Sequence, residues 1–507
     1  MRSKVKGQRS KGALLRGCAG FAFCLLTFDL IGCAKTPASL PSPRLDPIVQ
    51  LRNDITTAIN APGVRRGVWG IAVRSLDRNE PLFELNSRAL IVPASVSKLV
   101  SVATAVAAVG WDYRYETTLR GTGPIVDGVL QGDLIVVGSG DPTIGGRAGE
   151  DLSPWIDALQ AKGIRRIDGR IIGDDDSVED PRPQLAWAWD DLGYPSGALF
   201  GALNLAENRL TVTVQPTGAP GGPTIVTLEP HAAYRPLSNR SVTGPMGSPQ
   251  ILWPEQRPGD PFLTIAGSMP AGAMPAQLAV SAGNPTFWFA SVLRNRLLQA
   301  GVEITREAFD IDDLGSKPDT AGATVLFTHR SRPLSEIVQP LLKNSINLYG
   351  EALLRLNAAS GALATNDAAL EGARTRMDSW GIPSDAWQII DGSGLSRRNA
   401  VAADVLVTVL QKMYDPAWMS AWMTALPIAG VDGTLAARMR GTAADGNVRA
   451  KTGTMSNIRS LAGYARTRDG EPLAFAIMVD NFEGSGTTAT DAVDRIAIAL
   501  ASFTRSN

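Results

Sequence analysis

The sequence predicts an α+β protein in which the two ends of the chain form one domain and the middle is an insertion. Three observations predict this arrangement. Strand-like segments occur near both ends, a long apolar helix lies close to the front, and the middle is rich in Pro and Gly between short alternating strands. At 507 residues the chain is long enough for about three domains.

The elements near both ends are predicted from periodicity and turn residues. Two strands near the front are separated by a polar turn, and two near the end enclose a turn at Arg468-Asp469-Gly470. The front helix carries Val, Leu and Ala on all sides, so we expect it to be buried within a domain. The predicted strands are 67–76, 81–85, 461–467 and 472–480, and the predicted helices are 95–109, ended by Gly110, and 487–503.

The middle of the chain has a different texture. Residues 115–140 consist of short strands and Gly turns, and residues 205–280 are rich in Pro and Gly around alternating strands such as 210–214. A helix is predicted from Pro285 to about Ala300. No repeat of fixed period is present. The short strands and turns of this region predict inserted, strand-rich structure.

Charge and cysteine placement exclude several classes of protein. The chain has 49 basic and 49 acidic side chains; residues 1–33 hold six bases and one acid, which leaves 43 and 48, or −5, for the rest. That balance provides no basic surface for nucleic acid. All three cysteines, Cys18, Cys24 and Cys33, lie within residues 1–33, so a mature chain without this segment has no disulfide.

Residues 1–33 predict an export signal. A basic stretch precedes an apolar run from Cys18 to Ile31, which at 14 residues is too short to cross a bilayer comfortably. The run ends in Leu30-Ile31-Gly32-Cys33, which resembles a bacterial lipobox and implies cleavage before Cys33 and lipid attachment to its thiol. An ordinary signal peptide is the alternative, and Asp29 inside the run favours it. A Pro-rich linker over 34–47 is expected to follow.

Ser95 and Lys98 stand at the start of the apolar front helix. At a spacing of three they share one helix face within contact distance. A serine hydroxyl becomes a nucleophile when a neighbouring base takes its proton, and a buried lysine can be that base because desolvation disfavours its charged form. A helix-capping Ser beside a solvent-facing Lys is the alternative, and Ser3 and Lys6 repeat the spacing.

Two further segments carry polar side chains of the same kind. Ser345 and Asn347 are two apart, so we expect them to point the same way only in a loop or an extended segment. Capping of the next helix by Asn344 and Ser345 is the alternative. The segment Lys451-Thr452-Gly453-Thr454 places a cation beside a Gly, where backbone can approach an anionic peptide terminus.

In this order, the SxxK, SxN and KTG motifs resemble those of the penicillin-binding proteins and serine β-lactamases. Ser95 and Ser345 are 250 residues apart, several-fold more than in most members, and Lys451 follows 106 residues later. So long a first gap, filled by a strand-rich insertion, resembles the D-alanyl-D-alanine carboxypeptidase/endopeptidase family, the class C low-molecular-mass penicillin-binding proteins or peptidase family S13. The resemblance covers the chain from about residue 50 to its end. Other segments that agree are Gly140-Asp141-Pro142-Thr143, Trp187-Ala188-Trp189-Asp190-Asp191, Asp391-Gly392-Ser393-Gly394-Leu395-Ser396-Arg397 and Gly430-Val431-Asp432-Gly433-Thr434-Leu435.

The resemblance implies a transpeptidase-like domain, an antiparallel sheet flanked by helices, that holds two nested insertions. A second domain is inserted after the SxxK helix, and a third, also strand-rich, is inserted into the second. The expected bounds are 48–110 and 326–507 for the catalytic domain, 111–204 and 276–325 for the second, and 205–275 for the third.

The resemblance also implies an exported, periplasmic serine carboxypeptidase and endopeptidase that acts on peptidoglycan stem peptides and cross-links. Such an enzyme is acylated by β-lactams and needs no cofactor and no metal, and His231 and His329 lie apart from any metal-binding pattern. The implied roles are Ser95 as nucleophile, Lys98 as base, Ser345 as proton relay and Asn347 on the acyl donor. Lys451 and Thr452 are implied to hold the substrate carboxylate or to help the relay, and Gly453 and Thr454 also belong to the implied substrate-binding set. The N–H groups of Ser95 and Thr454 form the implied oxyanion hole.

By the same resemblance, Asp191 and Arg397 meet the amino and carboxylate groups at the end of a diaminopimelate side chain. Exposed loop residues without a binding role are the alternative. Ser456 stands five residues beyond Lys451, where some relatives have Gln, so the cross-link pocket is expected to differ.

Two rival functions are open at this stage. A serine β-lactamase shares Ser95 and Lys98 but needs a deacylation device such as a positioned Glu and water, which the sequence does not reveal. A non-catalytic peptidoglycan-binding protein on the same fold is disfavoured because all three motifs are intact.

Overall fold

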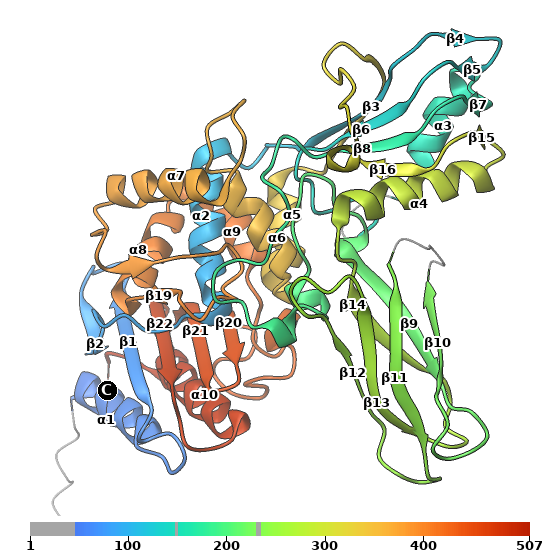
Figure 1. Ribbon diagram of the computed structural model, residues 1–507. Helices are drawn as coiled ribbons and strands as arrows, with labels where there is room; N and C mark the ends of the chain where they lie inside the picture. The colour runs from blue at the N-terminus through green and yellow to red at the C-terminus, as the bar shows by residue number, and fades with distance from the viewer. Residues whose placement is uncertain (1–45, 148–150, 230–234, 507) are drawn as a thin grey trace, which may run out of the picture. The chain divides into compact units, whose positions relative to one another are not determined.

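Both ends of the chain join in one antiparallel sheet, in the strand order β2-β1-β22-β21-β20 (Figure 1). The computed structural model describes residues 46–147, 151–229 and 235–506. The predicted signal peptide with Cys33, and the linker up to residue 45, lie outside these residues. The strands are β1 (Val68–Ser75), β2 (Pro81–Leu85), β20 (Arg449–Met455), β21 (Ile458–Arg466) and β22 (Pro472–Asp480).

This sheet is buried on both faces, which explains why β22 is apolar from Pro472 to Val479. Alternate residues of β22 from Leu473 to Val479 pack with α1 (Pro47–Ile59) and α10 (Gly486–Ser502). The residues between them, Ala474, Ala476 and Met478, face the opposite helical layer. Successive side chains of a strand point to opposite faces, so a strand between two helical layers needs apolar residues at every position.

The opposite layer is built around the apolar helix predicted near the front. The chain first makes a 3₁₀ turn over Ala94–Ser97, and the α-helix begins only at Lys98; Gly110 ends it at a φ of +80°, as predicted. Every residue from Lys98 to Val106 is buried, because neighbouring helices surround α2. The helices are α2 (Lys98–Val109), α5 (Leu334–Asn344), α6 (Asn347–Arg355), α7 (Asn366–Ser379), α8 (Ala403–Met413) and α9 (Pro416–Ala425), with short strands β18 (Trp387–Gln388) and β19 (Ala400–Val401).

A second sheet, in the order β16-β8-β6-β3-β17, follows the SxxK helix and packs against α3 and α4. It runs past the predicted domain boundary at residue 325, because β17 pairs with β3 as far as Arg330. Its elements are β3 (Glu116–Gly121), β6 (Leu134–Val137), α3 (Ser153–Ala161), β8 (Ile171–Asp174), α4 (Pro285–Gln299), β16 (Ala308–Asp310) and β17 (Thr324–Arg330), beside the short strands β4 (Ile125–Val126), β5 (Val129–Leu130), β7 (Arg166–Ile167) and β15 (Glu303–Ile304).

The chain between β8 and α4 forms two small sheets, β10-β9-β14 and β11-β13-β12 (green in Figure 1). The predicted boundary at residue 275 divides one of these sheets, because Ala276–Ser281 pairs with β9 along its whole length. Among the described residues, no helix is both long and apolar enough to span a membrane. The strands are β9 (Arg209–Gln215), β10 (Ile225–Glu229), β11 (Leu237–Gly244), β12 (Ile251–Glu255), β13 (Leu263–Pro270) and β14 (Ala276–Ser281).

Candidate active site

Ser95 and Lys98 meet at the start of the buried helix. Ser95 lies in the 3₁₀ turn, where three residues complete one turn and positions i and i+3 line up. The Nζ of Lys98 donates to Ser95 Oγ at 2.9 Å. Ala94, directly before Ser95, has a φ of +47°, a left-handed conformation that is uncommon for a residue with a side chain. Local backbone strain is therefore located immediately beside the predicted nucleophile.

Lys98 is completely buried and is surrounded by acceptors. Besides Ser95, its Nζ donates to Asn347 Oδ1 at 2.7 Å and to the backbone carbonyl of Ser393. Burial lowers the pKa of Lys98 to about 7, while the carboxylates of Asp391 and Glu351 act in the opposite direction. The neutral amine that a general base requires is therefore well populated near neutral pH.

Ser345 and Asn347 reach the same site because the chain turns sharply between two helices. Ser345 ends α5 in a left-handed conformation with a φ of +60°, and Asn347 is the first residue of α6. The alternative of a capping pair does not hold, since Ile346 is the N-cap of α6 and no side chain bonds there. The amide of Asn347 donates to the Ser196 carbonyl at 2.8 Å, which links α6 to the segment that carries Asp191.

Lys451 approaches from the edge strand β20. It is fully buried, and its Nζ donates to Ser345 Oγ at 2.9 Å and to its neighbour's carbonyl, Thr452 O, at 2.7 Å. Burial lowers the pKa of Lys451 well below the ordinary lysine value, and the nearby Lys98 charge adds to this effect. The hydroxyl of Thr452 donates to Thr434 Oγ1 at 2.8 Å, so a residue of the Gly430–Leu435 segment supports the motif.

Gly453 is required by packing within the protein. A Cβ at this position would lie 2.1 Å from Ser460 Oγ and 2.6 Å from the Pro93 carbonyl oxygen. The sequence predicted that backbone comes close to a ligand here, whereas the close approach seen is between β20 and the chain just before Ser95. Thr454, the next residue, is exposed and borders the cleft.

One cleft of about 360 Å³ brings together residues that are far apart in the sequence. Ser95, Asn347 and Thr454 line it, and so do Asp191 and Arg397. Burial raises the pKa of Asp191, the charge of Asp190 adds to this shift, and the guanidinium of Arg397 opposes it. The sequence-predicted nucleophile and the two predicted side-chain contacts therefore share a single cavity, which Ser456 also borders.

The chain matches the D-Ala-D-Ala carboxypeptidase 3 (S13) family over residues 51–501. It belongs to this family. A D-alanyl-D-alanine carboxypeptidase of Actinomadura sp. strain R39 is 33% identical over 97% of this chain and 91% of its own length. The D-alanyl-D-alanine carboxypeptidase DacB of Haemophilus influenzae is 25% identical over 82% of this chain and 85% of its own.

Crystal structures of relatives show the same fold. Penicillin-binding protein 4 from Haemophilus influenzae superimposes with a TM-score of 0.77 at 23% identity, over 89% of this chain and 98% of that one. The same protein complexed with a novel β-lactam gives a TM-score of 0.71 at 24% identity, over 87% and 98%. The family and the α+β penicillin-binding-protein fold predicted from the three motifs are thus confirmed.

Three further residues of this S13 member surround Lys98, and none of them was given a role from the sequence. Glu351 and Asp391 are buried carboxylates near its ammonium group, and Ser393 accepts its hydrogen bond. A signal for Glu351 was present, because it follows Asn347 by four residues and so lies on the same face of α6. No periodicity marks Asp391 and Ser393, which lie in a loop.

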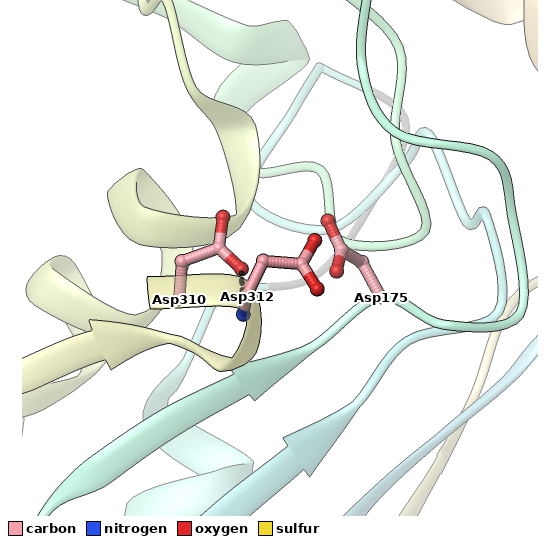
Figure 2. Close-up of side chains that lie close together, drawn as sticks. All are labelled: Asp175, Asp310 and Asp312. Carbon is pink, nitrogen blue, oxygen red and sulfur yellow. Dashed lines mark hydrogen bonds between the residues drawn. The ribbon is translucent and has the colours of Figure 1, made fainter. Parts of the chain in front are cut away.

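An acidic cluster outside the cleft consists of Asp175, Asp310 and Asp312, whose carboxylates face one another (Figure 2). Burial raises the pKa of Asp175 to about 7, and one of its oxygens has no partner among the described residues. Protein donors already hold the cluster, so we assign no cation to it. They are Thr286 on Asp175 at 2.5 Å, Asn284 on Asp310 at 2.8 Å and Lys317 on Asp312 at 2.6 Å.

His329, the one histidine within the described residues, belongs to no cluster there that could hold a metal ion. His329 is buried, with Nε2 3.5 Å from Asp141 Oδ2 and its ring beside Trp155. His231 lies outside the described residues.

Proposed function

We propose that this S13-family protein is a serine-type D-alanyl-D-alanine carboxypeptidase that also cleaves peptide cross-links of peptidoglycan. The observation that carries the proposal is the position of Lys98 Nζ, which lies 2.9 Å from Ser95 Oγ and 2.7 Å from Asn347 Oδ1. A buried amine of lowered pKa in contact with a partly exposed serine hydroxyl is the arrangement that activates a serine nucleophile.

The reaction is acyl transfer in two steps. Ser95 Oγ attacks the carbonyl carbon between the two D-alanines while Lys98 takes the hydroxyl proton. The C–N bond then breaks, and the leaving amine receives a proton through Ser345, which is hydrogen-bonded to Lys451. Water attacks the ester of Ser95, releases the shortened peptide and restores the hydroxyl. Backbone N–H groups of Ser95 and Thr454 stabilise the oxyanion in both steps.

Cross-link cleavage needs the same bond chemistry with a larger leaving group. The amine then belongs to the side chain of a neighbouring stem peptide. Asp191 and Arg397 offer opposite charges in the cleft that holds Ser95, which suits the zwitterionic end of a diaminopimelate side chain. Thr452, Gly453 and Thr454 form the wall of β20 on which the terminal carboxylate lies. The predicted second domain contributes to this site through the segment that carries Asp191.

A time course of intact mass with benzylpenicillin tests the proposal. We expect one lasting adduct on the wild-type chain and none on Ser95→Ala, with a thermal midpoint that shows the variant is folded. Adduct formation on Ser95→Ala would refute the assignment of the nucleophile. Rapid loss of the adduct with turnover of the drug would identify a serine β-lactamase, and the absence of any adduct would indicate a non-catalytic binding protein. Separate assays on a pentapeptide and on a cross-linked dimer then measure the two peptidase activities.

We further propose export to the periplasm and a lipid anchor at Cys33. The basic and apolar composition of residues 1–33 supports the first statement, and the Leu30-Ile31-Gly32-Cys33 segment supports the second. Fractionation and mass analysis of the mature N-terminus test both. A water-soluble mature chain without lipid would restrict the proposal to export by an ordinary signal peptide.

A further inference from the structure

A buried carboxylate outside the predicted catalytic set, Glu351, lies directly behind Lys98. It sits on α6 and is only 1% exposed. Its Oε1 accepts the N–H of Ser393 at 2.9 Å, and its Oε2 accepts the N–H of Gly392 at 3.2 Å. A burial of this degree is costly for a carboxylate, so both bonds must contribute to holding it there.

Glu351 and Lys98 contact the same residue, Ser393, through its two adjacent peptide groups. Ser393 donates its N–H to Glu351 and accepts from Lys98 Nζ with its carbonyl. A neutral amine has two N–H bonds and one lone pair. When the Ser393 carbonyl and Asn347 Oδ1 accept the two N–H bonds, the lone pair is left to face Ser95 Oγ.

We propose that Glu351 is a positioning residue for the base: it fixes the Ser393 peptide so that the Lys98 lone pair points at the Ser95 hydroxyl. The inference rests on the proposed function, in which Lys98 deprotonates Ser95. Glu351 does not line the substrate cleft, and its hydrogen bonds go to the Gly392-Ser393 backbone.

The loop is fixed on its other side as well. The hydroxyl of Ser101, one turn after Lys98 on α2, donates to the Gly392 carbonyl at 2.8 Å. Backbone contact between α6 and the loop is direct, since a Cβ on Gly350 would lie 2.7 Å from Gly392 O. Two helices therefore hold one peptide segment, α2 through its carbonyl and α6 through its N–H groups.

The charges around the base decide how its pH dependence responds to Glu351. Lys98 faces the carboxylates of Glu351 on α6 and Asp391 in the loop, and the ammonium of Lys451 on β20. Arg355 lies behind Glu351, with Nη1 3.9 Å from its Oε2, and is paired with Glu179. Burial raises the pKa of Glu351 to about 7, and its ionised form favours the Lys98 ammonium. Glu351→Gln takes this interaction away wherever Glu351 is ionised, so neutral Lys98 should persist to lower pH.

The test is the pH profile of acylation by a chromogenic cephalosporin under single-turnover conditions. For Glu351→Gln we expect an acylation rate about tenfold lower, the effect of a lost hydrogen bond to a charged group. The acid limb of the profile should move to lower pH, and the concentration dependence of binding should not change. Glu371→Gln, the same change on the exposed face of α7, is the control and should match wild type in all three quantities.

A folded Glu351→Gln with the wild-type acylation rate and pH profile would overturn the proposal. If Glu351→Gln does not fold, Ser101→Ala replaces it, because it loosens the same loop from α2. That variant should acylate several-fold more slowly, and an unchanged rate would contradict the inference. A wild-type chain that fails to acylate at Ser95 would instead refute the proposed function, so the two failures are distinguishable.

Discussion

The indole N–H of Trp187 donates to Asp391 Oδ2 at 2.7 Å, although the two residues are 204 positions apart in the chain. Asp391 is fully buried and also accepts the backbone N–H groups of Gly394 and Ser396 at 2.7 and 2.6 Å. A single carboxylate thereby joins the segment that leads to Asp191 with the loop that leads to Arg397. The two sides of the proposed side-chain subsite are held at a fixed separation by this contact.

Replacement of Trp187 by Phe should therefore impair recognition of the diaminopimelate end selectively. The ring is retained and one N–H···O bond to a charged acceptor is lost, which is typically about 1.5–3 kcal/mol, or roughly 10- to 100-fold when fully expressed. We expect kcat/KM for a peptide with a free zwitterionic end to fall about tenfold. Acylation by a β-lactam that lacks such a group should stay close to the wild-type rate.

Trp189→Phe is the matched control for this experiment. Trp189 lies in the same segment and is 52% exposed, so the same substitution there should leave both rates unchanged. Equal losses on the peptide and on the β-lactam in Trp187→Phe would show that the contact supports the catalytic residues rather than the subsite.

The pKa of Lys98, lowered to about 7 by its burial, predicts the pH dependence of acylation. The neutral amine is the active form of a base, so the acylation rate should rise with pH through about 7 and then level off. An unperturbed lysine would place this rise near 10.4. Stopped-flow acylation with a chromogenic β-lactam at constant ionic strength measures it, over roughly pH 5 to 10 so that both pKa values are covered. A rate that still increases tenfold per pH unit above pH 8, as expected roughly for a base of ordinary lysine pKa, would contradict Lys98 as the base.

Gly453→Ala should damage both stability and activity. The added methyl group would overlap Ser460 Oγ and the Pro93 carbonyl, so β20 must move away from the segment that precedes Ser95. Overpacking of this kind costs about 1–3 kcal/mol of unfolding free energy. Thermal or urea unfolding measures the loss, and acylation should fall with it. At Gly218 a Cβ meets nothing within 4 Å, so Gly218→Ala controls for the loss of glycine itself.

The sequence predicted the elements and motifs near both ends well because those signals are local. The strands β1, β2, β21 and β22 alternate or are apolar throughout between recognisable turns, and α10 closes the chain as expected. The three motifs were placed correctly in order, and the family they indicate is confirmed. The predicted first turn of the Ser95 helix was wrong in type, since the chain makes a 3₁₀ turn there, packed against β20 and the loop at Gly394.

The supporting roles of Asp391 and Trp187 were not predictable for a physical reason. Both residues act through contacts between segments that the chain brings together only on folding. The strand pairings across the predicted boundaries at residues 275 and 325 were equally hidden from the sequence. Strands β14 and β17 pair with partners 60 or more residues away, and no local pattern states which sheet a strand will join.

Asp191→Ala should separate side-chain recognition from the acyl-transfer chemistry. Asp191 lines the cleft with Ser95 but forms part of the segment from the inserted region, and burial raises its pKa while Arg397 opposes that shift. Loss of one charge partner in a partly exposed site should weaken kcat/KM about 5- to 20-fold for a substrate with a free diaminopimelate end. Asp191→Asn tests charge alone, and Asp190→Ala, its exposed neighbour, is the positional control. Comparison with an otherwise identical peptide that lacks the free end decides the matter. A similar loss on both peptides would mean that Asp191 supports the architecture of the cleft, whereas a loss confined to the first would assign Asp191 to the ammonium group of the substrate.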